Sequence, residues 1–132
     1  LYDAYDRGAD TALILDFNGN VAEGPGFNVF CVKDSKLSTP AVGVLPGITR
    51  RTEFDLCAEA KLPAEATDVG VAVLKAADEV FITSTAGGIM PVTTIDGAPV
   101  ADGKVGPITS RLMALYWRKH EDPAWSSAVR YP

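Results

Sequence analysis

Hydrophobic and polar residues alternate in short runs in the first forty positions, and the runs predict small strands. The apolar stretches 11–16 and 27–32 have the β-branched and aromatic content of strands. Asn18-Gly19 lies between 11–16 and a short strand at 20–23, and this dipeptide is a strong hairpin signal. We therefore predict an antiparallel meander after a short helix that ends near Gly8.

The remaining residues predict helices interleaved with strands. Helices are predicted to open at 45–50 and at 106–109, and strands at 69–73 and 79–83. On the first helix the residues that can share one apolar face are Ile48, Phe54 (or Glu53), Leu56 and Ala60. Asp96-Gly97 predicts a further hairpin turn. The expected fold class is α+β, with an antiparallel-rich mixed sheet or pseudo-barrel and flanking helices, in one domain over residues 1–132.

The composition and charge of the chain argue against nucleic-acid binding and membrane insertion. The chain has 132 residues, a net charge of −5 and 12 Lys and Arg residues that form no cluster, so we expect no nucleic-acid partner. No apolar run approaches the roughly 20 residues that span a bilayer, so we expect no membrane segment. The 2 cysteines are expected to be buried free thiols, which favours a cytoplasmic location.

The residue types present argue against a catalytic histidine triad and against a metal site. His120 is the only histidine and is expected at a solvated helix end. A histidine triad or a multi-histidine metal site cannot be assembled from this chain alone, and no metal is expected. Asp16, Asn18 and Asn20 resemble a calcium loop, but its required glycine and glutamate are absent.

Three glycine-bearing loops are the candidates for a binding site. Glu23 precedes Gly24-Pro25-Gly26 and could face a flat ligand, or could be a solvated turn residue. Gly47 and Thr49 at a helix N-terminus could bind an anion, although Thr49 could equally cap its own helix. The segment 83–88 carries three hydroxyls and two glycines that could hold oxyanions, or bond local backbone. Together the loops suit a phosphorylated pyridine better than a nucleotide.

The same loops belong to a series of motifs that resembles a known enzyme family. The segments resemble fold-type IV (class IV, branched-chain-type) pyridoxal-phosphate-dependent aminotransferases in order and spacing, and the one at 85–91 is similar to that of (R)-selective amine transaminases. The matching segments are Asp6-Arg7-Gly8, Glu23-Gly24-x-Gly26-Phe27-Asn28, Leu45-Pro46-Gly47-Ile48-Thr49-Arg50, Thr85-Ala86-Gly87-Gly88-Ile89-Met90-Pro91, Asp96-Gly97-x-Pro99 and Gly106-Pro107-Ile108-Thr109.

The resemblance implies a role for each matched residue. Glu23 would hold the pyridine nitrogen of pyridoxal 5′-phosphate and keep it protonated. Gly47, Ile48 and Thr49 would hold the phosphate, with a further contact from Thr85. The substrate pocket would be lined by Thr85, Ala86 and Gly87. Arg50 would add positive charge near the phosphate.

The resemblance also implies what this chain lacks. In the family the Schiff-base lysine lies on a strand that would fall before Leu1, so no catalytic residue is expected in the chain, and the small domain that precedes it is also expected to be missing. Pro25 stands where the family often has serine or threonine. The isolated chain is expected to bind the cofactor weakly and to be inactive. The matched domain would be the C-terminal cofactor-binding part of the large domain.

The function implied is transfer of an amino group between an amine or amino acid and a keto acid such as pyruvate, in a homodimer. Three alternatives remain open at this level. The protein could be a lyase acting on aminodeoxychorismate, which would share the cofactor loops. It could be a lysine-less remnant that acts as a binding or assembly module. Finally, a separate N-terminal fragment could co-fold with it as a partner.

Overall fold

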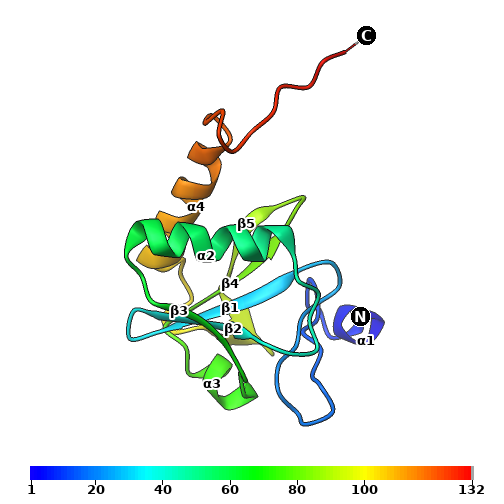
Figure 1. The fold of residues 1–132 in the computed structure, drawn as a ribbon. Coiled ribbons are helices and arrows are strands. Elements are labelled where there is room, and N and C mark those ends of the chain that lie inside the picture. Colours follow the sequence, from blue (N-terminus) through cyan, green and yellow to red (C-terminus); the bar gives the residue numbers. More distant parts are fainter. Residues whose placement is uncertain (132) are drawn as a thin grey trace.

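A computed structural model describes residues 1–131, and its centre is a five-stranded mixed sheet in the order β3-β2-β1-β4-β5 (Figure 1). A two-stranded ribbon of β6 and β7 follows it. The strands are β1 (Asn28–Lys33), β2 (Lys36–Pro40), β3 (Ala64–Thr67), β4 (Glu79–Ser84), β5 (Gly88–Val92), β6 (Thr94–Ile95) and β7 (Ala98–Pro99). The helices are α1 (Tyr2–Asp6), α2 (Ile48–Ala60), α3 (Val71–Lys75) and α4 (Pro107–Lys119). The predicted α+β class with a mixed sheet and flanking helices is confirmed.

Strand pairing brings two distant segments next to each other at the centre of the sheet. β1 pairs antiparallel with β2 through a tight turn in which Asp34 and Ser35 have φ of 49° and 62°. On its other edge β1 pairs antiparallel with β4, which places Asn28 opposite Thr83. The parallel pair is β2 with β3, and it needs the α2 crossover to join its strands. Asn28 and Thr83 thereby reach one end of the sheet together.

Two apolar clusters cover the two faces of the sheet. α2 and α4 pack on one face, around Phe30, Phe81, Leu56 and Leu112. α3 lies on the opposite side, where a smaller cluster includes Val29 and Leu74 (Figure 1). Both cysteines, Cys31 and Cys57, are buried and free, as predicted. Within residues 1–131 no helix is long and apolar enough to cross a membrane.

Three predicted strands are replaced by other structure. Residues 11–23, which cover two of them, form an irregular hairpin with the isolated bridge Leu15–Val21 and do not join the sheet. Their turn at Asn18-Gly19 is held by Asp16, whose carboxylate accepts the Asn18 N–H at 2.8 Å. Residues 69 and 70 precede α3, and Val71–Lys75 form this helix instead of a strand, with Leu74 buried in the second cluster. The antiparallel meander predicted for the first forty residues is therefore correct only for β1 and β2.

The start of α4 depends on a buried carboxylate from β4. Glu79 accepts the N–H of Ile108 at 3.0 Å and of Thr109 at 2.7 Å. A Cβ on Gly106 would lie 2.0 Å from the Glu79 Cδ, so only glycine allows this approach. A helix N-terminus favours a negative charge at this position. Glu79 therefore replaces the side-chain cap that Gly106 cannot provide.

Replacing Glu79 with alanine is expected to lower the free energy of unfolding by about 3 kcal/mol, since two buried N–H groups lose their acceptor. Urea denaturation followed by circular dichroism measures this. Glu79→Gln keeps one acceptor oxygen and should lose less. An alanine variant within about 0.5 kcal/mol of wild type would contradict the assignment of this cap.

Candidate functional site

Glu23 is positioned by a tight turn that requires glycine. The Gly24 N–H donates to the Phe27 carbonyl at 3.1 Å, and the Phe27 N–H returns to the Gly24 carbonyl at 3.3 Å. A Cβ on Gly24 would lie 2.0 Å from the Phe27 ring and 2.6 Å from the Ala12 carbonyl oxygen. The turn therefore keeps its backbone against the Phe27 ring and leaves the half-buried Glu23 side chain free to face the adjoining pocket.

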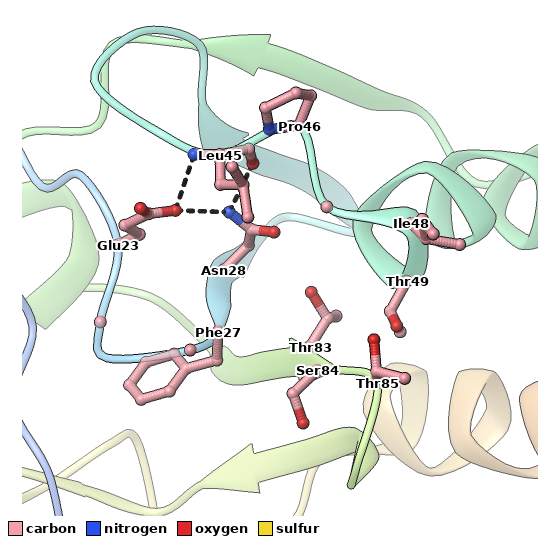
Figure 2. A pocket seen from close by; sticks show the side chains of 13 residues that line it. Glu23, Phe27, Asn28, Leu45, Pro46, Ile48, Thr49, Thr83, Ser84 and Thr85 are labelled. Atoms are coloured by element: carbon pink, nitrogen blue, oxygen red, sulfur yellow. Dashed lines mark hydrogen bonds between the residues drawn. The ribbon is translucent and has the colours of Figure 1, made fainter.

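Asn28 connects Glu23 to the loop before α2. Its Nδ2 donates to Glu23 Oε2 at 3.0 Å and to the Leu45 carbonyl at 3.1 Å. The Leu45 N–H donates to the same Glu23 oxygen at 2.9 Å (Figure 2). Two donors on one oxygen fix the direction of the carboxylate. Both hydrogen bonds to this carboxylate within residues 1–131 use Oε2, so Oε1 keeps its capacity to accept from a ligand.

The first turn of α2 presents an uncapped helix N-terminus. Gly47 precedes the helix with extended backbone, and no side chain caps the first N–H groups. A Cβ at Gly47 would lie 2.3 Å from Asn28 Oδ1, so glycine is required for the loop to approach Asn28. The Thr49 side chain points inward and is 6% exposed, whereas Ile48 is 71% exposed. This is the geometry that helix N-termini use to bind anions.

The end of β4 supplies further hydroxyl groups. Thr83 is buried, and its Oγ1 has no hydrogen-bond partner among the described residues. Ser84 Oγ accepts the Gly87 N–H at 3.0 Å and so shapes the turn before β5. Thr85 follows at the exposed start of that turn. Thr83 and Thr85 both line the same pocket as Thr49.

One pocket of about 370 Å³ joins these three regions, a volume in the range of small-molecule sites. Figure 2 shows the Glu23 carboxylate at one side and the hydroxyl groups of Thr49, Thr83 and Thr85 grouped at the other. The predicted cofactor residues Glu23, Gly47, Ile48, Thr49 and Thr85 all line it. A carboxylate acceptor opposite an uncapped helix N-terminus and hydroxyl donors matches the two polar ends of a phosphorylated pyridine.

The remaining predicted substrate residues lie beside this pocket. Ala86 and Gly87 form the turn between β4 and β5 and do not line the pocket. A Cβ at Gly87 would lie 2.4 Å from the Met90 sulfur, so Met90 packs against the back of the turn. Their contact with a substrate therefore remains a prediction.

Arg50 does not face the pocket. Its Nη2 donates to the Pro40 carbonyl at 2.9 Å, and its guanidinium lies 5.5 Å from the centre of the Phe54 ring. Burial lowers the pKa of the guanidinium from its usual value. The positive charge expected near the phosphate is thus directed at the end of β2 instead.

No lysine lines the pocket within residues 1–131. Five of the lysines pair with acidic residues, the shortest being Lys75 with Asp96 and Lys119 with Glu59, both at 2.6 Å. Lys61 ends α2 in the left-handed conformation. None of them is placed to react with a ligand in this pocket.

Sequence reasoning did not assign a role to Asn28 or identify the burial of Glu53. Asn28 belongs to one of the matched motifs, but its hydrogen bond to the Leu45 carbonyl joins residues 17 positions apart, so no local signal in the sequence indicates it. The sequence did not decide whether Phe54 or Glu53 lies on the buried face of α2. The structure buries Glu53 completely. The predicted inward position of Ile48 is wrong, because the N-terminus of α2 turns Thr49 inward instead.

The fold and the site together define an α+β domain in which one pocket joins an acidic residue, an uncapped helix N-terminus and hydroxyl groups. The family model for amino-transferase class IV matches residues 2–95. The chain belongs to this family.

Relatives and solved structures agree with that membership. The chain is 39% identical over 118 residues to the branched-chain-amino-acid aminotransferase of Pseudomonas aeruginosa, covering 89% of this chain and 38% of that protein. It is 38% identical to a probable branched-chain-amino-acid aminotransferase of Aquifex aeolicus, covering 87% and 38%. The chain therefore spans about two fifths of the length of these relatives.

The branched-chain amino acid aminotransferase of T.th. has a similar structure. Complexed with N-(5′-phosphopyridoxyl)-L-glutamate, it superposes with a TM-score of 0.92 at 34% identity, over 98% of this chain and 46% of that one. With pyridoxamine 5′-phosphate the TM-score is 0.89 at 35% identity, over 94% and 42%. Both solved structures contain a phosphorylated pyridine group.

Proposed function

We propose that the protein containing this chain is a pyridoxal-phosphate-dependent aminotransferase, and that this chain forms most of the cofactor-binding surface. The observation that carries the proposal is the convergence of Glu23, the α2 N-terminus and the β4 end on one pocket. The relatives named as aminotransferases, and their phosphopyridoxyl-containing structures, support the same assignment.

In this proposal the two polar sides of the pocket hold the two ends of the cofactor. Glu23 binds the pyridine nitrogen, and the pair of bonds to its Oε2 keeps the carboxylate oriented. Ile48 and Thr49 donate backbone N–H groups, and Thr49 and Thr85 donate hydroxyls, to the phosphate. When bound, the protonated pyridine ring supplies an electron sink for the carbanion formed at the substrate carbon.

The reactive amine must come from another part of the protein. No lysine lines the pocket within residues 1–131, so we place the Schiff-base lysine in a part of the protein outside this chain. The residues of this chain then act by binding, orienting and holding a proton at the ring nitrogen. None of these residues acts as the nucleophile in the proposed reaction.

Two amino donors are candidates. The segment Thr85-Ala86-Gly87-Gly88-Ile89-Met90-Pro91 favours an (R)-amine with pyruvate as the acceptor. The named relatives favour branched-chain amino acids. Turnover of (R)-1-phenylethylamine with pyruvate, compared with turnover of leucine, separates these candidates in the full-length enzyme. Activity with leucine alone would reject the amine assignment.

The phosphate assignment is tested with Thr49→Val in the full-length protein. We expect its affinity for pyridoxal 5′-phosphate to fall about ten- to hundredfold, because a hydrogen bond to a charged group contributes about 1.5–3 kcal/mol. Thr52→Val is the matched control, since Thr52 lies on the same helix and does not line the pocket. Fluorescence titration measures both. Equal affinities in the two variants would contradict the site.

A further inference from the structure

Glu53 is a buried acid directly behind the anion-binding turn of α2. It is 0% exposed, and it lies four residues after Thr49, which is also buried on the same inward face. Four residues correspond to about 6 Å along a helix axis. Oε1 accepts the Cys57 thiol at 3.7 Å, while Oε2 has no partner within residues 1–131. This acid lies outside the sequence motifs of the cofactor loops.

No positive charge compensates Glu53 within the described residues. The elements packed on α2 are α4, β4 and β3, together with Phe30 of β1 against Phe54 and Pro40 of β2 at Arg50. Their ionisable side chains are Arg111, Tyr116, Arg118, Lys119, Glu79, Glu65, Cys31, Lys33 and Lys36. Among residues 1–131 none of these forms a hydrogen bond or ion pair with Glu53. Lys119 pairs with Glu59, Glu65 pairs with Lys36, and Glu79 caps α4.

The charged residues of α2 itself are also directed elsewhere. Arg50 bonds the Pro40 carbonyl, and Arg51, Asp55 and Glu59 are exposed. Cys57 is the ionisable group in contact with Glu53, and burial raises the pKa of its thiol to about 12, so it stays neutral. An ionised Glu53 would therefore be an isolated buried charge.

We propose that Glu53 is a proton-linked positioning residue of the phosphate site: it is a neutral acid while an anion occupies the Gly47–Thr49 turn, and its ionisation weakens anion binding. This inference rests on the proposed function, because it takes the anion to be the cofactor phosphate. An anion at the first turn of α2 and an ionised, fully buried carboxylate on the next turn repel each other more strongly than they would in water.

Thermodynamic linkage makes the coupling reciprocal. An anion that binds more weakly when Glu53 is ionised must itself favour protonation of Glu53. Binding near neutral pH therefore takes up protons at this side chain. A purely structural role for Glu53, such as filling space beside Cys57, does not produce this proton uptake.

The test compares the full-length wild type with Glu53→Gln, which keeps the shape and removes the charge. The affinity for pyridoxal 5′-phosphate is measured at pH 6 and pH 8.5. The free cofactor titrates identically in both experiments, so the ratio of affinities isolates the contribution of Glu53 in the complex. We expect the wild type to lose about tenfold more affinity than the variant over this interval. Asp55→Asn is the matched control, because it removes an exposed acid two positions away.

A second readout is the number of protons taken up when the cofactor binds. Titration calorimetry in buffers of different ionisation enthalpy counts the protons taken up on binding at pH 7.5. We expect the wild type and Asp55→Asn to take up about half a proton more than Glu53→Gln.

The possible failures are distinguishable. Cofactor binding with the same pH dependence and proton uptake in all three proteins would overturn the role of Glu53 and leave the proposed function intact. If the wild type did not bind the cofactor at either pH, both the proposed function and this inference would be rejected.

Discussion

Replacing Glu23 with glutamine in the holoenzyme is expected to lower kcat by about two to three orders of magnitude, the usual loss when one preorganised electrostatic contact is removed. Glutamine can still accept the bonds from Asn28 and Leu45 with its amide oxygen. It cannot, however, provide the negative charge that the proposed function uses to keep the ring nitrogen protonated. The loss therefore reflects the charge and not a collapse of the loop.

The measurement is steady-state kinetics together with the cofactor affinity of the same preparations. The cofactor should remain bound, because Glu23→Gln leaves the proposed phosphate contacts at Thr49 and Thr85 unchanged. Glu121→Gln, an exposed acid beyond α4, is the matched control. A kcat of Glu23→Gln within a factor of about three of wild type would show that the ring nitrogen is not the partner of this carboxylate.

Glu53 is expected to give the largest pH-dependent change in stability. Burial raises the pKa of its carboxyl from 4.5 to about 7, and the Cys57 thiol lowers it in part. Between these values the folded protein binds more protons than the unfolded chain, so the free energy of unfolding falls as pH rises from about 4.5 to 7. Above pH 7 the loss is complete and no longer changes with pH.

Glu53→Gln removes this slope because the amide does not ionise. Relative to wild type, the variant should gain roughly 2 kcal/mol between pH 5 and pH 8, as the linkage relation requires for this shift. Urea denaturation at both pH values measures the double difference, which cancels the pH-independent cost of a buried amide. Asp55→Asn should retain the wild-type slope. If Glu53→Gln also retained that slope, the carboxyl would have to be ionised in the folded protein throughout this range.

The sequence determined the elements whose signals are local. α2 and α4 follow from apolar spacing and from the glycines that precede them, and their bounds agree with the predicted openings. The Asp96-Gly97 turn follows from residues that tolerate positive φ, here 50° and 76°. Five predicted cofactor residues share one pocket because their motifs end or begin regular elements.

Tertiary structure decided what depends on distant neighbours. Whether 11–16 became a strand depended on β1, which pairs with β2 and β4 and leaves no free edge for it. Whether Ile48 or Thr49 turned inward depended on the contact of Gly47 with Asn28. The burial of Glu53 and the direction of Arg50 were set by packing across the sheet. Periodicity reports only which residues share a face of an element, whereas their burial and charge state depend on the segments that fold against that face.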